Sequence, residues 1–580
     1  MSSMSSIHTN SFSMVGNKGS DVLSSTGDPR LDLSVKCVRN APADDLKATL
    51  RSVLALGTQE ALEDAFVLAF HTRNIRGGKG ERKVFYDLFM TLAEDKPELA
   101  KAVLNLVPHY GCWQDLFAMA PLEGVDSAEP TYIGWAMLDL YKKQLLDDST
   151  NVAGTLSLAA KWAPREGGKQ SNIAKQLAFD LFPHVPSHSA KMRRYRQFVS
   201  DLNAKLKTVE TYMSGNRWDE IVPAAVPGRA GKLYAKAFLN LPSTYKGKRS
   251  DGEFRCPGDV KRVACRTHFE EHFAKTAKGM AKIHGADTLF PHEVVKKASV
   301  TILGHCRGNP LSAAEKDQLN GIWRSMVMKA KAGGGLGRSI FMSDFSGSMQ
   351  SSTAGDTPYW VSMALGILGA ETCSAEFQDR LMTFDSYPQW HHFSPGSDLF
   401  ERIQTIHDSS IGQGTSTDFQ KAMDLVLQTL KDKRCRPGQE PENLIVLTDM
   451  NWDQACDSAG ASRYTGNRYR HVVKTDTWQT HIAMIQESFK RAGEDMWGPG
   501  MGFTAPRIVI WNLATSSQTD FHATANTPGV AMLSGWSASQ FEVLQKEGPR
   551  QLTAYEILRL ELDDPKYQRV RDRIRAALAA

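Results

Sequence analysis

The stretch SIFMSDFSGSM, residues 339–349, decides the fold class of the C-terminal part of the chain. Its first five residues form a short apolar run, which is typical of a buried strand. The run passes directly into a turn that carries Asp344, Ser346 and Ser348. Because ligands of open α/β sheets bind beyond the carboxyl ends of the strands, the sequence predicts a binding site at this turn.

Strand-like and helix-like segments alternate from this stretch to the end of the chain. We expect further strands at 381–384, 444–448, 508–511 and 530–533, and helices at 360–377, 419–430, 480–491, 537–547 and 553–562. Such alternation predicts an α/β domain with a parallel, doubly wound sheet over residues 338–580.

Two more loops of this domain carry oxygen ligands. Residues 414–418, GTSTD, precede a predicted helix and offer the hydroxyl of Thr415 or Thr417, and Asp449 follows the strand predicted at 444–448. Carboxylate and hydroxyl oxygens suit a hard divalent cation such as Mg²⁺, which retains some of its water. The sequence therefore predicts a divalent-cation site built from three loops.

The order and spacing of these loops resemble the metal-ion-dependent adhesion site of the von Willebrand factor A family. The resemblance implies that Mg²⁺ or Mn²⁺ is held directly or through water, and that an acidic group of a partner fills the open position. Thr417 is preferred to Thr415 because Thr-Asp at this point resembles the Ro-type version of the domain. The ligands so implied are Asp344, Ser346, Ser348, Thr417 and Asp449.

The chain before this domain has a different pattern. Apolar residues recur at spacings of three and four, for example over 62–70 and 84–92, and the expected helices are joined by short loops. We expect a HEAT-like helical-repeat domain over 28–331, although no strict period is visible. Residues 332–337, AGGGLG, are typical of a linker, and the Ser-, Asn- and Gly-rich residues 1–27 of a disordered tail.

Charge is distributed unevenly along the chain. The net charge is +5, but residues 151–338 hold 32 lysines and arginines against 15 acidic residues, a net charge of +17. A basic stretch of this size often marks a nucleic-acid partner. The alternative is that these cations only solvate the exposed faces of helices.

Several cations are candidates for contact with RNA phosphates, which accept both arginine and lysine. The segment 77–80, GGKG, lacks the spacing of a nucleotide-binding phosphate loop and follows a helix, so an RNA contact is favoured there. Around 191–196, Tyr195 is interleaved with cations in a pattern that favours base stacking, or else forms part of a solvated helix. The candidates are Arg76, Lys79, Arg82, Lys83, Lys161, Arg165, Lys169, Lys191, Arg193, Arg194 and Arg196.

Six short motifs of the helical part carry a second resemblance. They are NIRGGKGER (74–82), YGCWQDL (110–116), AKWAP (160–164), ETYMS (210–214), RWDEI (217–221) and LFPHE (289–293). From about residue 45 the chain resembles the uncharacterised family called domain of unknown function twenty-eight twenty-eight, which is related to the Ro autoantigen, or TROVE, proteins. The resemblance implies a TROVE-like ring of helical repeats closed by the A domain, a structured or single-stranded RNA ligand, and a role in a ribonucleoprotein.

Other signals point to less specific conclusions. Cys256, Cys265, His268 and His272 could bind zinc, or could simply lie on an amphipathic helix. The eight scattered cysteines are typical of reduced thiols in a cytoplasmic protein. The sequence contains no run of 18 apolar residues, so we expect no membrane-spanning helix. We find no catalytic motif and do not expect an enzyme.

Two functions follow as hypotheses. The first is a Ro-like RNA-binding protein whose metal site binds a protein or an anionic ligand. The alternative is a metal-dependent protein-interaction scaffold without RNA, for example a partner of a MoxR-type ATPase.

Overall fold

The computed structural model describes residues 13–15, 21–119, 132–151, 154–242, 254–303, 311–350, 356–384, 388–409, 419–450, 478–514, 521, 523–547 and 552–580. The chain divides into two compact units. The sheet unit comprises Met1–Leu56, Phe290–Leu303 and Met326–Leu562, and the helical unit comprises Gly57–Leu289, Gly304–Ser325 and Asp563–Ala580. The units are interleaved in sequence, whereas the composition had predicted contiguous domains separated at residues 332–337.

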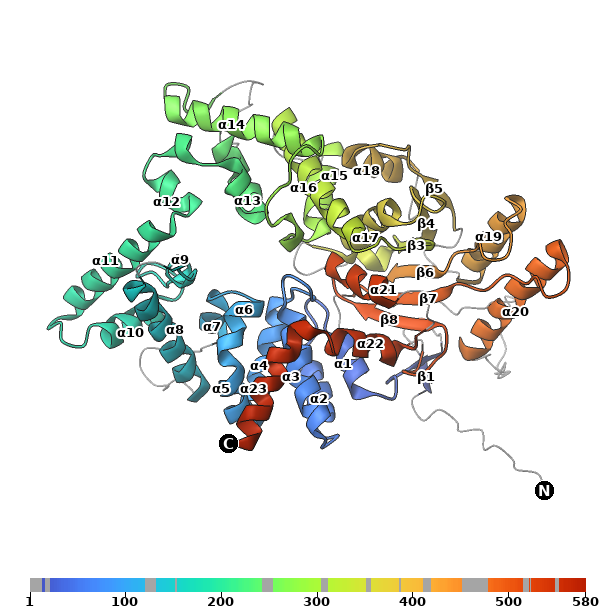
Figure 1. Cartoon of the computed structure of the whole chain (residues 1–580), viewed down its shortest axis with the longest axis horizontal. Helices are drawn as coiled ribbons and strands as arrows, with labels where there is room; N and C mark the ends of the chain where they lie inside the picture. Colours follow the sequence, from blue (N-terminus) through green and yellow to red (C-terminus); the bar gives the residue numbers. More distant parts are fainter. Residues whose placement is uncertain are drawn as a thin grey trace, which may run out of the picture. The chain divides into compact units, whose positions relative to one another are not determined.

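A six-stranded sheet forms the centre of the sheet unit, with the spatial order β5-β4-β3-β6-β7-β8 (Figure 1). The strands β4, β3, β6, β7 and β8 are parallel. Numbered along the chain within this sheet, the order is third, second, first, fourth, fifth, sixth, which is the doubly wound order. The bounds are β3 Ser339–Asp344, β4 Arg380–Phe384, β5 Trp390–His392, β6 Asn443–Thr448, β7 Arg507–Asn512 and β8 Val530–Ser534.

The predicted mixed order of strands and helices is confirmed, but the sheet is not wholly parallel. Strand β5 was not predicted, and it pairs antiparallel with β4. Only five residues separate these two strands, which is too few for the crossover that a parallel pair needs.

Helices connect and cover the strands. The helix α17 packs on β3, and its two interior glycines explain how closely it approaches. A Cβ atom at Gly369 would lie 2.3 Å from the ring of Phe341, and one at Gly366 would lie 2.5 Å from the Ser343 hydroxyl. The helices that follow β3 in this unit are α17 Pro358–Thr372, α18 Leu399–Asp408, α19 Phe419–Asp432, α20 Trp478–Trp497, α21 Phe541–Glu547 and α22 Ala554–Leu562.

Segments far from the sheet in sequence complete this unit. They are the strands β1 (Ser13–Val15) and β2 (Asp21–Leu23) and the helices α1 (Pro29–Lys36), α2 (Ala43–Leu54) and α15 (Pro291–Ile302). The strand-end side chains of Asn512 and Ser534 donate to the carbonyls of Val35 and Ser34, at 3.2 and 2.7 Å. The carboxyl ends of β7 and β8 are therefore bonded to α1.

The N-terminal residues correct one expectation. Residues 13–15 and 21–23, which we expected to be disordered, form an antiparallel pair. Leu23 also exchanges two backbone hydrogen bonds with Phe521, of 2.8 and 3.0 Å. These backbone groups find partners in the sheet unit, which local composition alone cannot indicate.

The helical unit consists largely of helices that pack against their neighbours in sequence, such as α3 with α4, α4 with α5, and α10 with α11. The helices α11 and α12 are separated at Lys207, whose φ of 49° is left-handed. The helix α16 (Ala313–Ala332) contributes residues to both units. The helices of the helical unit that precede it are α3 Gln59–Arg73, α4 Arg82–Asp95, α5 Pro97–Val103, α6 Val107–Tyr110, α7 Gln114–Met119, α8 Tyr132–Thr150, α9 Ala159–Trp162, α10 Ser171–Leu181, α11 His188–Leu206, α12 Val209–Ser214, α13 Gly228–Phe238 and α14 Val260–Ala277.

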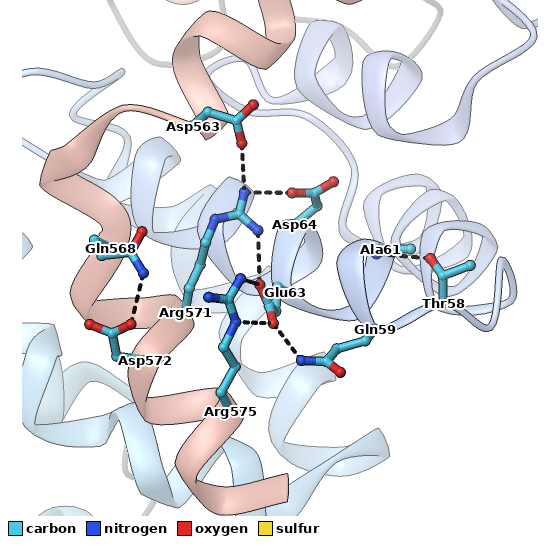
Figure 2. Close-up of polar contacts among 10 residues, drawn as sticks. All are labelled: Thr58, Gln59, Ala61, Glu63, Asp64, Asp563, Gln568, Arg571, Asp572 and Arg575. Carbon is cyan, nitrogen blue, oxygen red and sulfur yellow. Dashed lines mark hydrogen bonds and ion pairs between the residues drawn. The ribbon is translucent and has the colours of Figure 1, made fainter.

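The C-terminal helix α23, Gln568–Ala579, was not predicted, and it packs on α3 and α5 of the helical unit (Figure 1). Arg571 forms ion pairs with Glu63 and Asp64 of α3 (Figure 2). Just before the helix, the buried hydroxyl of Tyr567 lies 2.9 Å from His71 Nδ1. Contacts between α3 and the C-terminal segment therefore join distant parts of the chain within this unit.

Candidate metal centre and basic surface

The carboxylate of Asp344 is the centre of the first site. Asp344 is the last residue of β3 and is completely buried. Its Oδ1 accepts a hydrogen bond from the Ser346 amide at 2.9 Å, and its Oδ2 accepts one from the Thr448 hydroxyl at 3.0 Å. Since an ionised carboxylate has about four lone-pair positions, these two bonds leave acceptor capacity for a cation or its water.

The two serine hydroxyls of the predicted loop lie together. Ser346 Oγ is 3.0 Å from Ser348 Oγ. Ser346 is buried and Ser348 is half-buried, so the hydroxyl pair extends from the buried carboxylate toward solvent. The loop therefore groups three of the oxygen ligands that the sequence singled out.

The neighbouring strand brings the second carboxylate. Asp449 follows β6 and is buried. The next residue, Met450, has a φ of 69°, a left-handed conformation that a side chain of this size rarely adopts. Its amide donates to Thr448 Oγ1 at 3.2 Å. Thr448, which we had not predicted, thus joins the two loops, because its hydroxyl also donates to Asp344.

These loops occupy the place where a doubly wound sheet binds ligands. Asp344 ends the first strand in chain order and Asp449 follows the fourth, and these two strands are neighbours in the sheet. The direction of the chain order reverses between them, which defines the topological switch point. The predicted ligands Asp344, Ser346, Ser348 and Asp449 are brought to this edge, while Thr417 and its alternative Thr415 lie outside the described residues.

The electrostatics fit a cation. Burial, and secondly the charge of Asp449, raise the pKa of Asp344 well above its ordinary value of 3.8. Two buried carboxylates with adjacent hydroxyls are a donor set for a hard divalent ion, which would offset their repulsion. The residues present therefore fit Mg²⁺ or Mn²⁺.

The candidate RNA contacts are distributed among exposed, paired and buried positions. On α11, Arg193 and Arg194 are exposed on the side away from the buried Met192 and Val199. The exposed candidates are Arg76, Arg82, Lys83, Arg165, Lys169, Arg193, Arg194 and Arg196, and the half-buried ones are Lys161 and Lys191. Ion pairs join Arg82 to Asp115, Lys83 to Asp87, Lys161 to Glu210 and Arg196 to Glu166.

Two expectations about this surface are wrong. Lys79 is buried, because its segment folds back onto α3: its amide donates to the His71 carbonyl and the Glu81 amide to the Thr72 carbonyl. A Cβ atom at Gly78 would lie 2.1 Å from that His71 carbonyl, so glycine is required. The motif therefore supplies partners for carbonyls at the end of a helix.

The second wrong expectation is base stacking by Tyr195. This residue is buried, and its hydroxyl donates to the Pro164 carbonyl at 3.1 Å. Its ring is therefore part of the helical packing and does not offer a face for base stacking.

The division into units also changes the charge balance. The helical unit contains 41 lysines and arginines and 32 acidic residues, a net charge of +9, and the sheet unit has a net charge of −4. The asymmetry is smaller than the +17 of residues 151–338 because the interleaved segments redistribute the charges.

No zinc site forms from the candidate cysteines and histidines. Among the described residues, no three His, Cys, Asp or Glu side chains are grouped as metal ligands. Cys265 is buried in an apolar cluster with Phe238 and Phe269, whereas His268 is exposed. This placement agrees with the amphipathic-helix interpretation. The described cysteines Cys37, Cys112, Cys256, Cys265, Cys373 and Cys435 form no disulfide with one another.

Two family models match separate parts of the chain. "Domain of unknown function (DUF7788)" matches residues 338–572, which include the strands β3 to β8, and "Domain of unknown function (DUF2828)" matches residues 137–243. The second match agrees with the predicted resemblance but covers less of the chain than we expected. The first was not predicted, and it leaves the von Willebrand factor A resemblance as a proposal.

The chain is also similar to individual proteins, among them the following two. The "Uncharacterized protein L728" of Acanthamoeba polyphaga mimivirus is 27% identical over 536 residues, which cover 90% of this chain and 82% of that protein. The crystal structure of the Deinococcus radiodurans Ro (RSR) protein aligns with 91% of this chain and all of its own, at 13% identity and a TM-score of 0.37. A score this low carries no argument about fold or function.

Within the described parts of the chain, no helix is both long and apolar enough to cross a membrane.

Proposed function

We propose that the sheet unit is an adhesion module of the von Willebrand factor A type, which binds an acidic group of a partner through a divalent cation. One observation carries this proposal: the buried carboxylate of Asp344 lies with Ser346, Ser348 and Asp449 at the switch point of the sheet. Polar oxygens converge there, as a cation site requires.

The residues of the chain divide the work of such a site. Ser346 and Ser348 would hold the ion through their hydroxyls, and Asp344 and Asp449 would supply the charge directly or through water. Thr448 keeps the two loops in register through its two hydrogen bonds. The bound ion supplies an electrophilic position that an acidic group can occupy. We propose binding and not catalysis, because a hydroxyl that ligates a metal is not thereby a nucleophile.

Isothermal titration of the full-length protein with MgCl₂ and MnCl₂ tests the metal site. We expect saturable binding with one ion per chain, and loss of that binding in Asp344→Ala. Ser362 is the matched control, because it is a buried serine that is not among the predicted ligands. Its hydroxyl lies 3.5 Å from the Leu447 carbonyl. Ser362→Ala should retain binding, whereas absence of binding by the wild-type protein would refute the proposal.

A second function, RNA binding by the helical unit, has a separate observation in its favour. This unit has a net charge of +9, and Arg165, Lys169, Arg193 and Arg194 are exposed in it. Phosphate contacts of this kind are sequence-independent and weaken steeply with salt.

Fluorescence anisotropy with a single-stranded RNA at several salt concentrations tests this function. Replacing Arg193 and Arg194 by Glu should weaken binding and flatten the salt dependence. Reversal of the charge at Arg436, an exposed residue of the sheet unit that lies over the Trp497 ring, is the control and should change neither. If RNA does not bind at low salt, or if the double reversal has no effect, the cations of α11 are only surface charges in contact with water.

A further inference from the structure

Two segments that are remote from the sheet in sequence meet the chain just after the metal loop. Asp356 directly precedes the N-cap residue of α17, Thr357. The Asp356 carboxylate lies 2.6 Å from Lys296 Nζ of α15, and 3.9 Å from both Arg39 Nη1 and His292 Nε2. Since Arg39 comes from the N-terminal segment, two separate parts of the sheet unit converge on a carboxylate of a third.

Aromatic rings hold the cations of this cluster in place. The Arg39 guanidinium lies over the rings of Trp536 and Phe290, at 4.2 and 4.8 Å from their centroids. The buried ring of His292 meets Trp536 edge to face at 5.0 Å. Stacking of this kind restricts the arginine, so the cluster presents a fixed arrangement of charge to Asp356.

Asp356 is charged at neutral pH. Burial raises its pKa, but the hydrogen bond from Lys296 and the nearby charges of His292, Lys296 and Arg39 more than offset this effect. The resulting pKa lies below the ordinary value of 3.8. The contact with Lys296 is therefore a charged hydrogen bond, which is shorter and stronger than a neutral one.

The first turn of α17 connects this cluster to the metal loop. Tyr359 packs edge to face on Phe345 with the ring centroids 5.5 Å apart. Phe345 is buried and lies between Asp344 and Ser346 in sequence. Residues on both sides of Phe345 are candidate ligands, so a shift of the first turn of α17 would reach them through one ring contact.

We propose that Asp356 and Lys296 are positioning residues of the metal site: their ion pair fixes the start of α17, and α17 fixes the Asp344–Ser348 loop through Phe345. This inference rests on the proposed metal site. In this proposal the motif LFPHE (289–293) and the helix α15 have a role in the sheet unit. Lys296 of α15 is the cation that holds Asp356 at the start of α17.

Binding of MnCl₂ to full-length variants tests this inference, and Lys296→Met is the decisive change. If Lys296 acted only through its charge, its removal would strengthen the binding of a cation. If it positions the loop, its removal should weaken Mn²⁺ binding, as should Asp356→Asn, by about tenfold, the typical effect of losing an indirect partner of a metal site.

Asp45→Asn is the matched control, because the Lys36–Asp45 pair of the same unit has a similar length, 3.0 Å, and similar partial exposure. It should leave Mn²⁺ affinity unchanged, and thermal unfolding without metal should shift by similar small amounts in the variants and the control. Wild-type affinity in Lys296→Met, tighter binding, or an equal loss in Asp45→Asn would overturn the inference. If the wild-type protein does not bind Mn²⁺, the proposed function itself fails.

Discussion

Arg571 of the C-terminal helix offers a sharp test of how the helical unit is held together. Its guanidinium lies 3.2 Å from Glu63 and 2.7 Å from Asp64, and all three side chains are buried (Figure 2). In Arg571→Met the buried Asp64 would lose its guanidinium partner, and Glu63 would keep only that of Arg575. Removing one partner of a buried ion pair costs roughly 3–5 kcal/mol, because the remaining charge is poorly compensated.

Hydrogen–deuterium exchange of the full-length protein measures this cost where it arises. A loss of roughly 3–5 kcal/mol corresponds to exchange that is faster by about two to three and a half orders of magnitude in the peptides of α3 and α23. Arg575→Met is the matched control. Arg575 also bonds to Glu63, at 2.7 and 2.8 Å, but half of its side chain is exposed, so the effect should be much smaller.

A second variant separates lost charge compensation from lost packing. Combining Arg571→Met with Glu63→Gln and Asp64→Asn removes the buried charges together, and should restore much of the protection. Equal exchange rates in Arg571→Met and Arg575→Met, or no recovery in the triple variant, would refute the idea that buried charge pairing holds the C-terminal helix on α3.

Three further predictions concern the two units. Burial raises the pKa of Glu63, but hydrogen bonds from Arg575, Gln59 and Arg571 outweigh this effect and hold the pKa below its ordinary value of 4.5. The ionised Glu63 therefore stabilises the folded state fully above pH 4.5, and this contribution should be lost as the pH falls through the lowered pKa. Acid unfolding followed by circular dichroism would show the loss. Gly369→Ala places a methyl group against the ring of Phe341 and should destabilise the sheet unit by about 1–3 kcal/mol in denaturant unfolding, and an unchanged midpoint would contradict the close approach of α17. Tyr567→Phe removes the hydroxyl that bonds to His71 and Asn74, leaves buried polar groups, and should cost about 1–3 kcal/mol by the same assay, whereas a neutral result would mean that water replaces the hydroxyl.

The sheet and its metal loop could be predicted because their signals are local. Buried parallel strands are largely continuous apolar runs, as in β3 and β6, and an aspartate ends β3 and directly follows β6. Strand β5 has no such run: it contains only WHH and pairs at the edge of the sheet. Thr448 was missed because its role depends on the alignment of two strands that lie far apart in the sequence.

The helical unit was harder to predict because its key contacts contradict ordinary expectations for charged residues. The helix α23, QRVRDRIRAALA, looks like a solvent-exposed surface, yet Arg571 is buried against acids some 500 residues away in sequence. Lys79 looks like a phosphate ligand but is buried by a loop that folds back on its helix. Buried, paired charges of this kind are rare, so composition and spacing favour the exposed interpretation.

A crystal structure of the full-length protein grown with MnCl₂ would test the central claim most directly. We predict one anomalous peak beside the hydroxyls of Ser346 and Ser348 and the carboxylates of Asp344 and Asp449, which is absent from crystals of Asp344→Ala. In MgCl₂ the same position should show oxygen ligands at about 2.0–2.1 Å. Wild-type crystals with no peak at the carboxyl ends of β3 and β6, or with manganese only elsewhere on the chain, would contradict the assignment of this edge as a divalent-cation adhesion site.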